Sequence, residues 1–76
     1  MAFGQTALSP EIWLRDVFSA KAVGRGEVIR RSLRDIERYA GLSRFLTEVE
    51  RRGFRAVENN GQVVVFCNRE TVRRLV

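Results

Sequence analysis

Hydrophobic residues recur along the chain with two different periods, one helical and one strand-like. The first helical run lies between residues 11 and 23, where Trp13, Leu14, Val17 and Phe18 share one face. Ser9-Pro10 precedes it with a capping residue and a proline suited to the first helical turn. Gly24-Arg25-Gly26 is expected to end the run. The pattern therefore predicts a first helix that extends to about residue 23.

A short strand and a second helix are predicted next. Val28–Arg31 is partly β-branched and follows the glycine-rich turn, which favours a strand. Ser32 then stands in the capping position of a short helix. The apolar residues of that helix share one face: Leu33, Ile36 and Ala40. Gly41 is expected to end it, because glycine adopts the left-handed conformation beyond a helix end at little steric cost.

A third helix is predicted to follow almost without a loop, capped by Ser43 and stopping at Gly53. Four apolar residues at the spacing i, i+3, i+4, i+7 form its core stripe: Leu42, Phe45, Leu46 and Val49. At about 100° per residue, Arg44, Thr47 and Arg51 point the opposite way. Glu48 is expected to pair with Arg44 or Arg52 along the helix.

The strongest local signal is Asn60-Gly61, which supplies the two positive φ angles of a tight β-hairpin turn. With this pair at the centre, Asn59 faces Gln62 and Val57 faces Val64. One hairpin face then carries Phe54, Ala56, Val63, Val65 and Cys67, and the other carries Val57, Val64 and Phe66. Because both faces of the returning strand are apolar, both are expected to be covered. The tail after the hairpin is predicted to form a final helical turn capped by Asn68.

Length and composition limit the classes of function. The 76 residues suffice for one small domain, expected over residues 9–76 with a flexible arm at 1–8. We expect a cytoplasmic protein, because no apolar run approaches a membrane span and residues 1–12 lack a secretory pattern. A single cysteine and no histidine argue against an internal disulfide and a Cys/His metal site. No acid–base pair or activated nucleophile is evident, so we expect no enzyme, no cofactor and no metal.

The charge of the chain is unevenly distributed. Residues 1–29 hold three basic and three acidic side chains, whereas residues 30–76 hold eleven arginines against six acids. The whole excess of +5 therefore lies in the second part of the chain. Arginine suits bidentate contacts to phosphate and guanine, although a GC-rich genome would also favour arginine codons.

The predicted order is helix, strand, helix, helix, strand, strand. Over roughly residues 10–68 this order resembles the winged helix-turn-helix family, an α+β domain of the helix-strand-helix-helix-hairpin type. The spacing of Ile36, Ala40, Gly41, Leu42 and Ser43 is similar to the helix-turn-helix motif, whereas Thr47 and Glu50 stand where apolar residues are common. The resemblance implies that the third helix enters the major groove of duplex DNA and that the hairpin is the wing.

The expected function is therefore that of a DNA-binding module, a small bacterial-type transcription regulator associated with the nucleoid. Its partners would be double-stranded DNA and a second copy, since one domain of this size has a limited footprint. Candidate base-reading residues are Arg44, Thr47 and Arg51. Candidate phosphate or wing contacts are Arg30, Arg31, Arg34, Ser43, Arg55, Asn59 and Gln62. Candidate dimer surfaces are the second hairpin face, Ile12 and Leu75-Val76.

Two other functions stay open at this stage. The segment 50–66 also resembles the helix and hairpin of double-stranded-RNA-binding-like toxins of the HicA type. Their catalytic histidine has no counterpart in this chain, so this resemblance implies RNA binding without cleavage. The third reading is a protein-interaction adaptor on a winged-helix scaffold, because a fold alone does not determine function.

Overall fold

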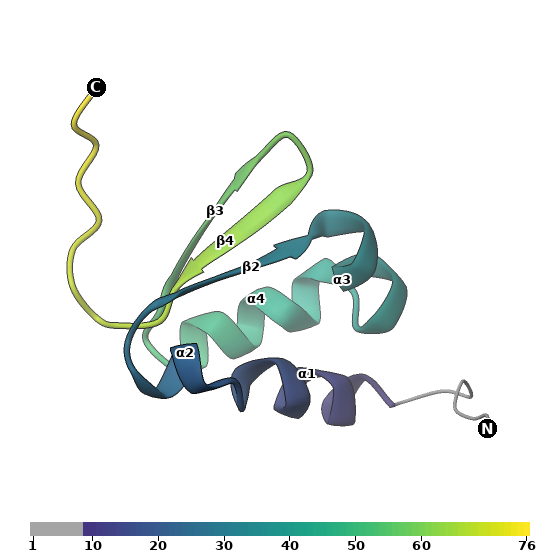
Figure 1. The fold of residues 1–76 in the computed structure, drawn as a ribbon. Helices are drawn as coiled ribbons and strands as arrows, with labels where there is room; N and C mark the ends of the chain where they lie inside the picture. The colour runs from purple at the N-terminus through teal and green to yellow at the C-terminus, as the bar shows by residue number, and fades with distance from the viewer. Residues whose placement is uncertain (1–8) are drawn as a thin grey trace.

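The computed structural model describes residues 9–76 as an α+β structure with one three-stranded sheet (Figure 1). Its elements in chain order are α1 (Pro10–Phe18), α2 (Lys21–Gly24), β2 (Val28–Ser32), α3 (Leu33–Tyr39), α4 (Leu42–Arg51), β3 (Arg55–Asn59) and β4 (Gln62–Phe66). The helices lie together on one side of the sheet, with α4 between the sheet and α1 in the view of Figure 1. The expected arm at residues 1–8 lies outside the described residues.

The first helix is shorter than predicted. Ser9 caps α1 by accepting a hydrogen bond from the Ile12 amide at 3.2 Å. The helix ends at Phe18 because the amide and hydroxyl of Ser19 both donate to the Asp16 carbonyl. Ala20 is extended, and a separate turn, α2, follows. The predicted continuous helix to residue 23 is therefore wrong, and the break redirects the chain so that Val23 joins the core.

The sheet order is β2-β4-β3 with both pairings antiparallel. Strand β2, which precedes α3 and α4, therefore pairs with the last strand, β4. Asn60 and Gly61 have φ angles of 51° and 78°, which confirms the predicted tight turn. The register confirms both predicted hairpin pairs, Asn59 with Gln62 and Val57 with Val64.

A positive-φ glycine separates α3 from α4. Ser32 caps α3 through a 3.0 Å hydrogen bond from the Asp35 amide, as predicted. Gly41 has a φ of 89° and is the N-terminal cap residue of α4, which lacks a side-chain cap bond. The prediction that Ser43 caps this helix is wrong. The sharp turn at Gly41 makes Leu42 already helical, so Ser43 lies inside the first turn.

The core joins the helices to the inner face of the sheet. Phe45 and Ile36 are fully buried and Val65 is 1% exposed. The ring of Phe45 lies 5.6 Å from that of Phe18 and 6.4 Å from that of Trp13, which ties α4 to α1. The predicted stripe of α4 is only partly correct: Phe45 and Val49 are buried, Leu42 is half-buried, and Leu46 is 41% exposed at the side of α4 next to β3.

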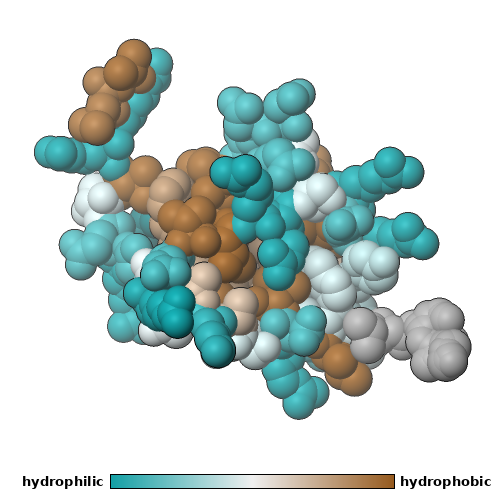
Figure 2. All heavy atoms as spheres, viewed as in Figure 1, coloured by the Kyte–Doolittle hydropathy of each residue, from teal (hydrophilic) through white to brown (hydrophobic). Residues whose placement is uncertain are grey.

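The other side of the sheet carries three rows of three residues, one from each strand in the order β2, β4, β3. The rows are Val28, Phe66 and Arg55; Arg30, Val64 and Val57; Ser32, Gln62 and Asn59. We call these nine residues the open sheet face. On this face Val64 and Phe66 of the returning strand are half-buried, and Val28 and Val57 on the strands beside it are 47% and 48% exposed. The predicted cover over this second face of the returning strand is not found in the described chain. Figure 2 shows hydrophobic residues gathered over the strands and bordered by hydrophilic ones.

The C-terminal tail runs away from the body of the domain without a helix (Figure 1), so the predicted final helical turn is wrong. Asn68 has a different role from the predicted cap. Its side-chain amide donates to the Gly26 carbonyl at 3.0 Å, and its Oδ1 accepts from the Glu70 amide at 2.9 Å. Asn68 thus fastens the end of the sheet to the turn before β2, and the residues beyond it are exposed.

Candidate nucleic-acid interface

Helix α4 turns a polar side away from the core. Because Phe45 and Val49 face inward, the residues on the opposite side of the helix are exposed: Ser43, Arg44, Thr47, Glu50 and Arg51. This side contains all three predicted base-reading residues together with Ser43. We call these five residues the outer side of α4.

Arg44 is held by the first helix. Its Nη1 donates to Oε2 of Glu11 in α1 at 2.8 Å, and the two side chains are 51% and 71% exposed. Of the two partners predicted for Glu48, Arg44 is therefore not the one found, because α1 lies close enough to α4 to supply an acid to Arg44. Exposed pairs of this kind are worth about 0–1 kcal/mol, so a phosphate or a base could displace Glu11 at small cost.

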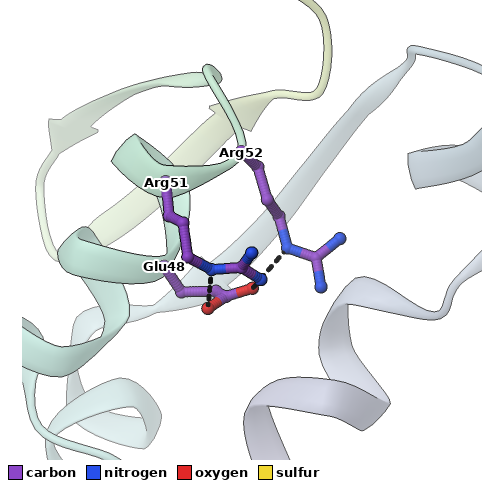
Figure 3. A network of polar contacts seen from close by, with 3 residues as sticks. All are labelled: Glu48, Arg51 and Arg52. Atoms are coloured by element: carbon purple, nitrogen blue, oxygen red, sulfur yellow. Dashed lines mark hydrogen bonds and ion pairs between the residues drawn. The ribbon is translucent and has the colours of Figure 1, made fainter.

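Glu48 binds two arginines at once (Figure 3). Its carboxylate accepts two hydrogen bonds from Arg51, at 3.2 and 2.6 Å, and one from Nε of Arg52 at 2.5 Å. The expected pair with Arg52 is confirmed. The hydrogen bond from Arg51 is the main cause that lowers the pKa of Glu48, and the same bond raises the pKa of Arg51. Glu48 is therefore charged at neutral pH, and its charge is neutralised locally.

Arg52 is directed toward α1 rather than toward the outer side of α4. Its guanidinium carbon lies 4.7 Å from the centre of the Phe18 ring, which is a cation–π distance. Arg52 therefore packs on the core, while Arg51 stays exposed on the surface.

Thr47 occupies the middle of the outer side of α4. Its hydroxyl donates to the Ser43 carbonyl at 3.0 Å, one turn earlier in the same helix. Because the hydroxyl is engaged with the backbone, the methyl group is the part of Thr47 best suited to a contact with thymine.

The hairpin tip is fastened to the start of α3. The Leu33 amide donates to the Gly61 carbonyl at 2.7 Å, and the Gly61 amide donates to Oε2 of Glu58 at 3.2 Å. Strand β2 pairs along the whole of β4, up to Ser32 opposite Gln62. The hairpin therefore ends level with the sheet instead of extending beyond it. Asn59 and Gln62 lie side by side in the last row of the open sheet face.

The remaining candidates are divided among three places. Arg30 and Arg55 lie on the open sheet face, and so do not join the outer side of α4. Arg31 is half-buried in β2, and its Nη1 donates to the Arg30 carbonyl at 2.9 Å. Arg34 is exposed in the first turn of α3. The structure thus brings together four of the ten predicted residues on α4 and four others on the open sheet face.

Sequence reasoning missed an apolar groove between the helices and the hairpin. It has a volume of about 240 Å³ and is lined by Leu33, Leu42, Leu46, Ala56, Val57, Glu58 and Val63. It explains why Leu46 is exposed although it belongs to an apolar pattern. The groove places the N-terminal half of α4 beside β3. Periodicity had assigned Leu46 to the core, whereas the structure places its side chain in the lining of this groove.

Metal ligands, membrane-spanning helices and the cysteine thiol can also be examined in the described residues. Within residues 9–76, no group of three or more potential metal ligands comes together, and no helix is long and apolar enough to span a membrane. Cys67 is 3% exposed, and burial raises the pKa of its thiol. A buried protonated thiol is a poor nucleophile, and Cys67 belongs to the hydrophobic core.

No protein-family model matches the chain, and the comparisons with curated proteins and with solved structures also found no match.

Proposed function

We propose that this protein is a winged helix-turn-helix module that binds duplex DNA through α4, as a small transcription regulator would. The observation that carries the proposal is the outer side of α4, which presents Arg44, Thr47 and Arg51 on one rigid helix. A ten-residue helix reaching the major groove with two arginines and a threonine can contact guanine edges, thymine methyls and phosphates.

The connectivity supports the same proposal. A helix, a strand, two helices joined at Gly41 and a hairpin occur in the order that the winged-helix resemblance implies. The first of these strands pairs with the last, giving the order β2-β4-β3. The hairpin would then lie beside the N-terminal half of α4, where a wing would flank the duplex.

The electrostatics of α4 are compatible with a polyanion. Glu48, which would repel phosphate, is neutralised by Arg51 and Arg52, so Glu50 is the acid of the outer side that retains an uncompensated charge. Arg44 is held by an exposed pair of small energy. DNA binding would exchange Glu11 for phosphate or guanine at Arg44 without exposing any core.

The RNA-binding alternative has less support. The resemblance to the toxin type covers only α4, β3 and β4, and leaves β2 and α3 without a role. The structure places β2 at an edge of the same sheet as the hairpin and ties it to the hairpin tip through the start of α3. A DNA-binding module of the winged type accounts for all of these elements.

The test is a fluorescence-anisotropy titration of a labelled random-sequence duplex at about 50 and 200 mM salt. We expect binding that weakens at the higher salt, as phosphate contacts require. Arg44→Ala should weaken binding about tenfold or more. Arg25→Ala, which removes the same charge from the exposed turn before β2, should have less than a threefold effect. Absence of duplex binding at 50 mM salt, or equal effects of the two variants, would refute the proposal.

A selection from randomised duplexes tests sequence-specific binding, which a transcription regulator requires. Wild-type protein should enrich a preferred site, and Arg44→Ala should lose that preference while weak binding survives. Sedimentation of the protein with the enriched site measures whether one copy binds or two. The expected homodimer predicts two copies, one on each of two paired half-sites.

A further inference from the structure

The open sheet face has an ordered arrangement of apolar and basic residues. Val28 and Phe66 are neighbours in the first row, and Val64 and Val57 are neighbours in the second. These four form a continuous apolar strip that crosses all three strands diagonally. Arg55 and Arg30 occupy the two remaining positions of the same rows, one on each side of the strip. Among the nine residues of the face there is no acid.

The described chain leaves this strip without a cover. The inner residues Ile29, Val63 and Val65 pack against the helices, whereas Val28 and Val57 on the other side remain nearly half exposed. The tail after Asn68 does not return over the strands in Figure 1. An apolar strip that crosses three strands, with half-buried Phe66 and Val64 between exposed Val28 and Val57 and with a charged border, is typical of a surface that binds a partner.

From this arrangement we propose that the open sheet face docks an acidic amphipathic segment of another protein. Apolar side chains of that segment would cover the strip from Val28 to Val57. Aspartate or glutamate residues on its two borders would pair with Arg30 and Arg55. Arg30 and Arg55 lie on opposite sides of the apolar strip, and the open sheet face contains no acid. A partner should therefore carry acids at a spacing that matches these two arginines.

A second copy of this chain is a poorer occupant. A twofold interface between two such faces would bring four arginines together with no acid on the face to pair with them. The exposed apolar end of the tail, Leu75 and Val76, directly follows Arg73 and Arg74. It would therefore bring further positive charge to Arg30 and Arg55.

Lipid and single-stranded nucleic acid also fit less well. Three of the four apolar residues are valines, which offer no aromatic ring for base stacking, and only Phe66 does. A sheet surface of short side chains with two arginines also lacks the large projecting hydrophobes and basic cluster that hold a protein on a membrane.

The proposal is tested with a library of random 12-residue peptides displayed on phage, selected on wild-type protein and depleted on Val28→Asp. Val28 is an exposed residue of an edge strand, and a circular dichroism spectrum checks that the variant is folded. We expect enriched peptides that contain apolar residues and at least two acids. Val28→Asp and Arg30→Glu should each weaken their binding tenfold or more. Ile12→Asp, at a similarly exposed apolar residue of α1, should change it less than twofold.

Several outcomes would overturn the inference. These are failure to enrich peptides that distinguish wild type from Val28→Asp, and enrichment of neutral or basic peptides. A wild-type dimer in sedimentation that Val28→Asp dissociates would assign the face to a second copy instead. Binding to vesicles of phosphatidylserine and phosphatidylcholine that Val28→Asp abolishes would assign it to lipid. The inference does not depend on duplex binding by α4, which is measured separately.

Discussion

Glu11 of α1 accepts a hydrogen bond from Arg44 of α4 at 2.8 Å, across 33 positions of sequence. This contact makes the first helix a competitor for the main candidate DNA-reading residue. Both side chains are more than half exposed, so the contact is screened by solvent and readily exchanged.

Glu11→Gln is therefore expected to strengthen duplex binding by up to about fivefold, since it removes a competing pair worth at most about 1 kcal/mol. Anisotropy titrations at several salt concentrations measure the effect. The matched control is Asp16→Asn, five residues later on α1, which should change affinity less because Arg44 has no bond to Asp16 among those described. Weaker binding by Glu11→Gln would mean that Arg44 needs Glu11 for its orientation.

Glu48 should contribute stability that depends on pH. Its pKa is lowered in the folded protein from the ordinary value of 4.5, chiefly by the hydrogen bond from Arg51. A lowered carboxyl pKa stabilises the fold above the unfolded pKa, and this contribution is lost as pH falls through the folded value. At pH 7, Glu48→Gln should be less stable than wild type by about 1 kcal/mol or less.

Urea unfolding at pH 7 and at about pH 3 checks this expectation, and the difference between wild type and variant should shrink at the lower pH. Glu50→Gln is the control, since this exposed neighbour has no ion pair among those described. A difference that grows on acidification would contradict the lowered pKa.

Phe45 and Leu46 are adjacent in sequence but differ in burial, at 0% and 41% exposure. Phe45→Ala should reduce the free energy of unfolding by about 3–5 kcal/mol, because it leaves a cavity beside the rings of Trp13 and Phe18. That loss is enough to unfold much of a small domain. Leu46→Ala should cost less than about 1 kcal/mol, since solvent already reaches the side chain in the groove. Denaturant titrations followed by Trp13 fluorescence measure both, and similar losses would show that Leu46 is covered in solution.

Alanine substitutions at Gly41 and Gly24 test the effect of backbone conformation where a new side chain meets no steric crowding. An added Cβ meets nothing within 4 Å at either position, but Gly41 has a φ of 89° and Gly24 is helical. Gly41→Ala should destabilise the fold by about 1–2 kcal/mol, because the left-handed region is costly for a residue with a side chain. Gly24→Ala should stabilise it by about 0.5–1 kcal/mol through reduced freedom of the unfolded chain. Melting temperatures that move in the same direction would contradict this account.

Local patterns in the sequence were sufficient for most of the elements. Asn60-Gly61 specified the hairpin and its register, because few residue pairs accept two positive φ angles. Gly41 specified the break between α3 and α4 for a similar reason. The α+β class and the order of strands and helices along the chain followed from local signals of this kind. The winged-helix arrangement and DNA binding remain proposals.

Hydrophobic periodicity gave a wrong prediction at three places. The run from Pro10 to Val23 has helical periodicity throughout, but it breaks at Ser19 and Ala20. Leu46 has the periodicity of a core residue, but it lines the open groove between α4 and β3 and is 41% exposed. The final tail has no partner in the described chain that would stabilise a helical turn, and short helices are marginal in water without one.

The sequence by itself determined where the chain turns and which side of each element is apolar, because φ preferences and side-chain periodicity act over a few residues. Only the tertiary structure decided what each side meets. It paired Arg44 with Glu11, grouped Arg30 and Arg55 on the uncovered side of the sheet, and tied the hairpin tip to Leu33. Such pairings depend on distances between segments far apart in the chain, which local patterns do not encode.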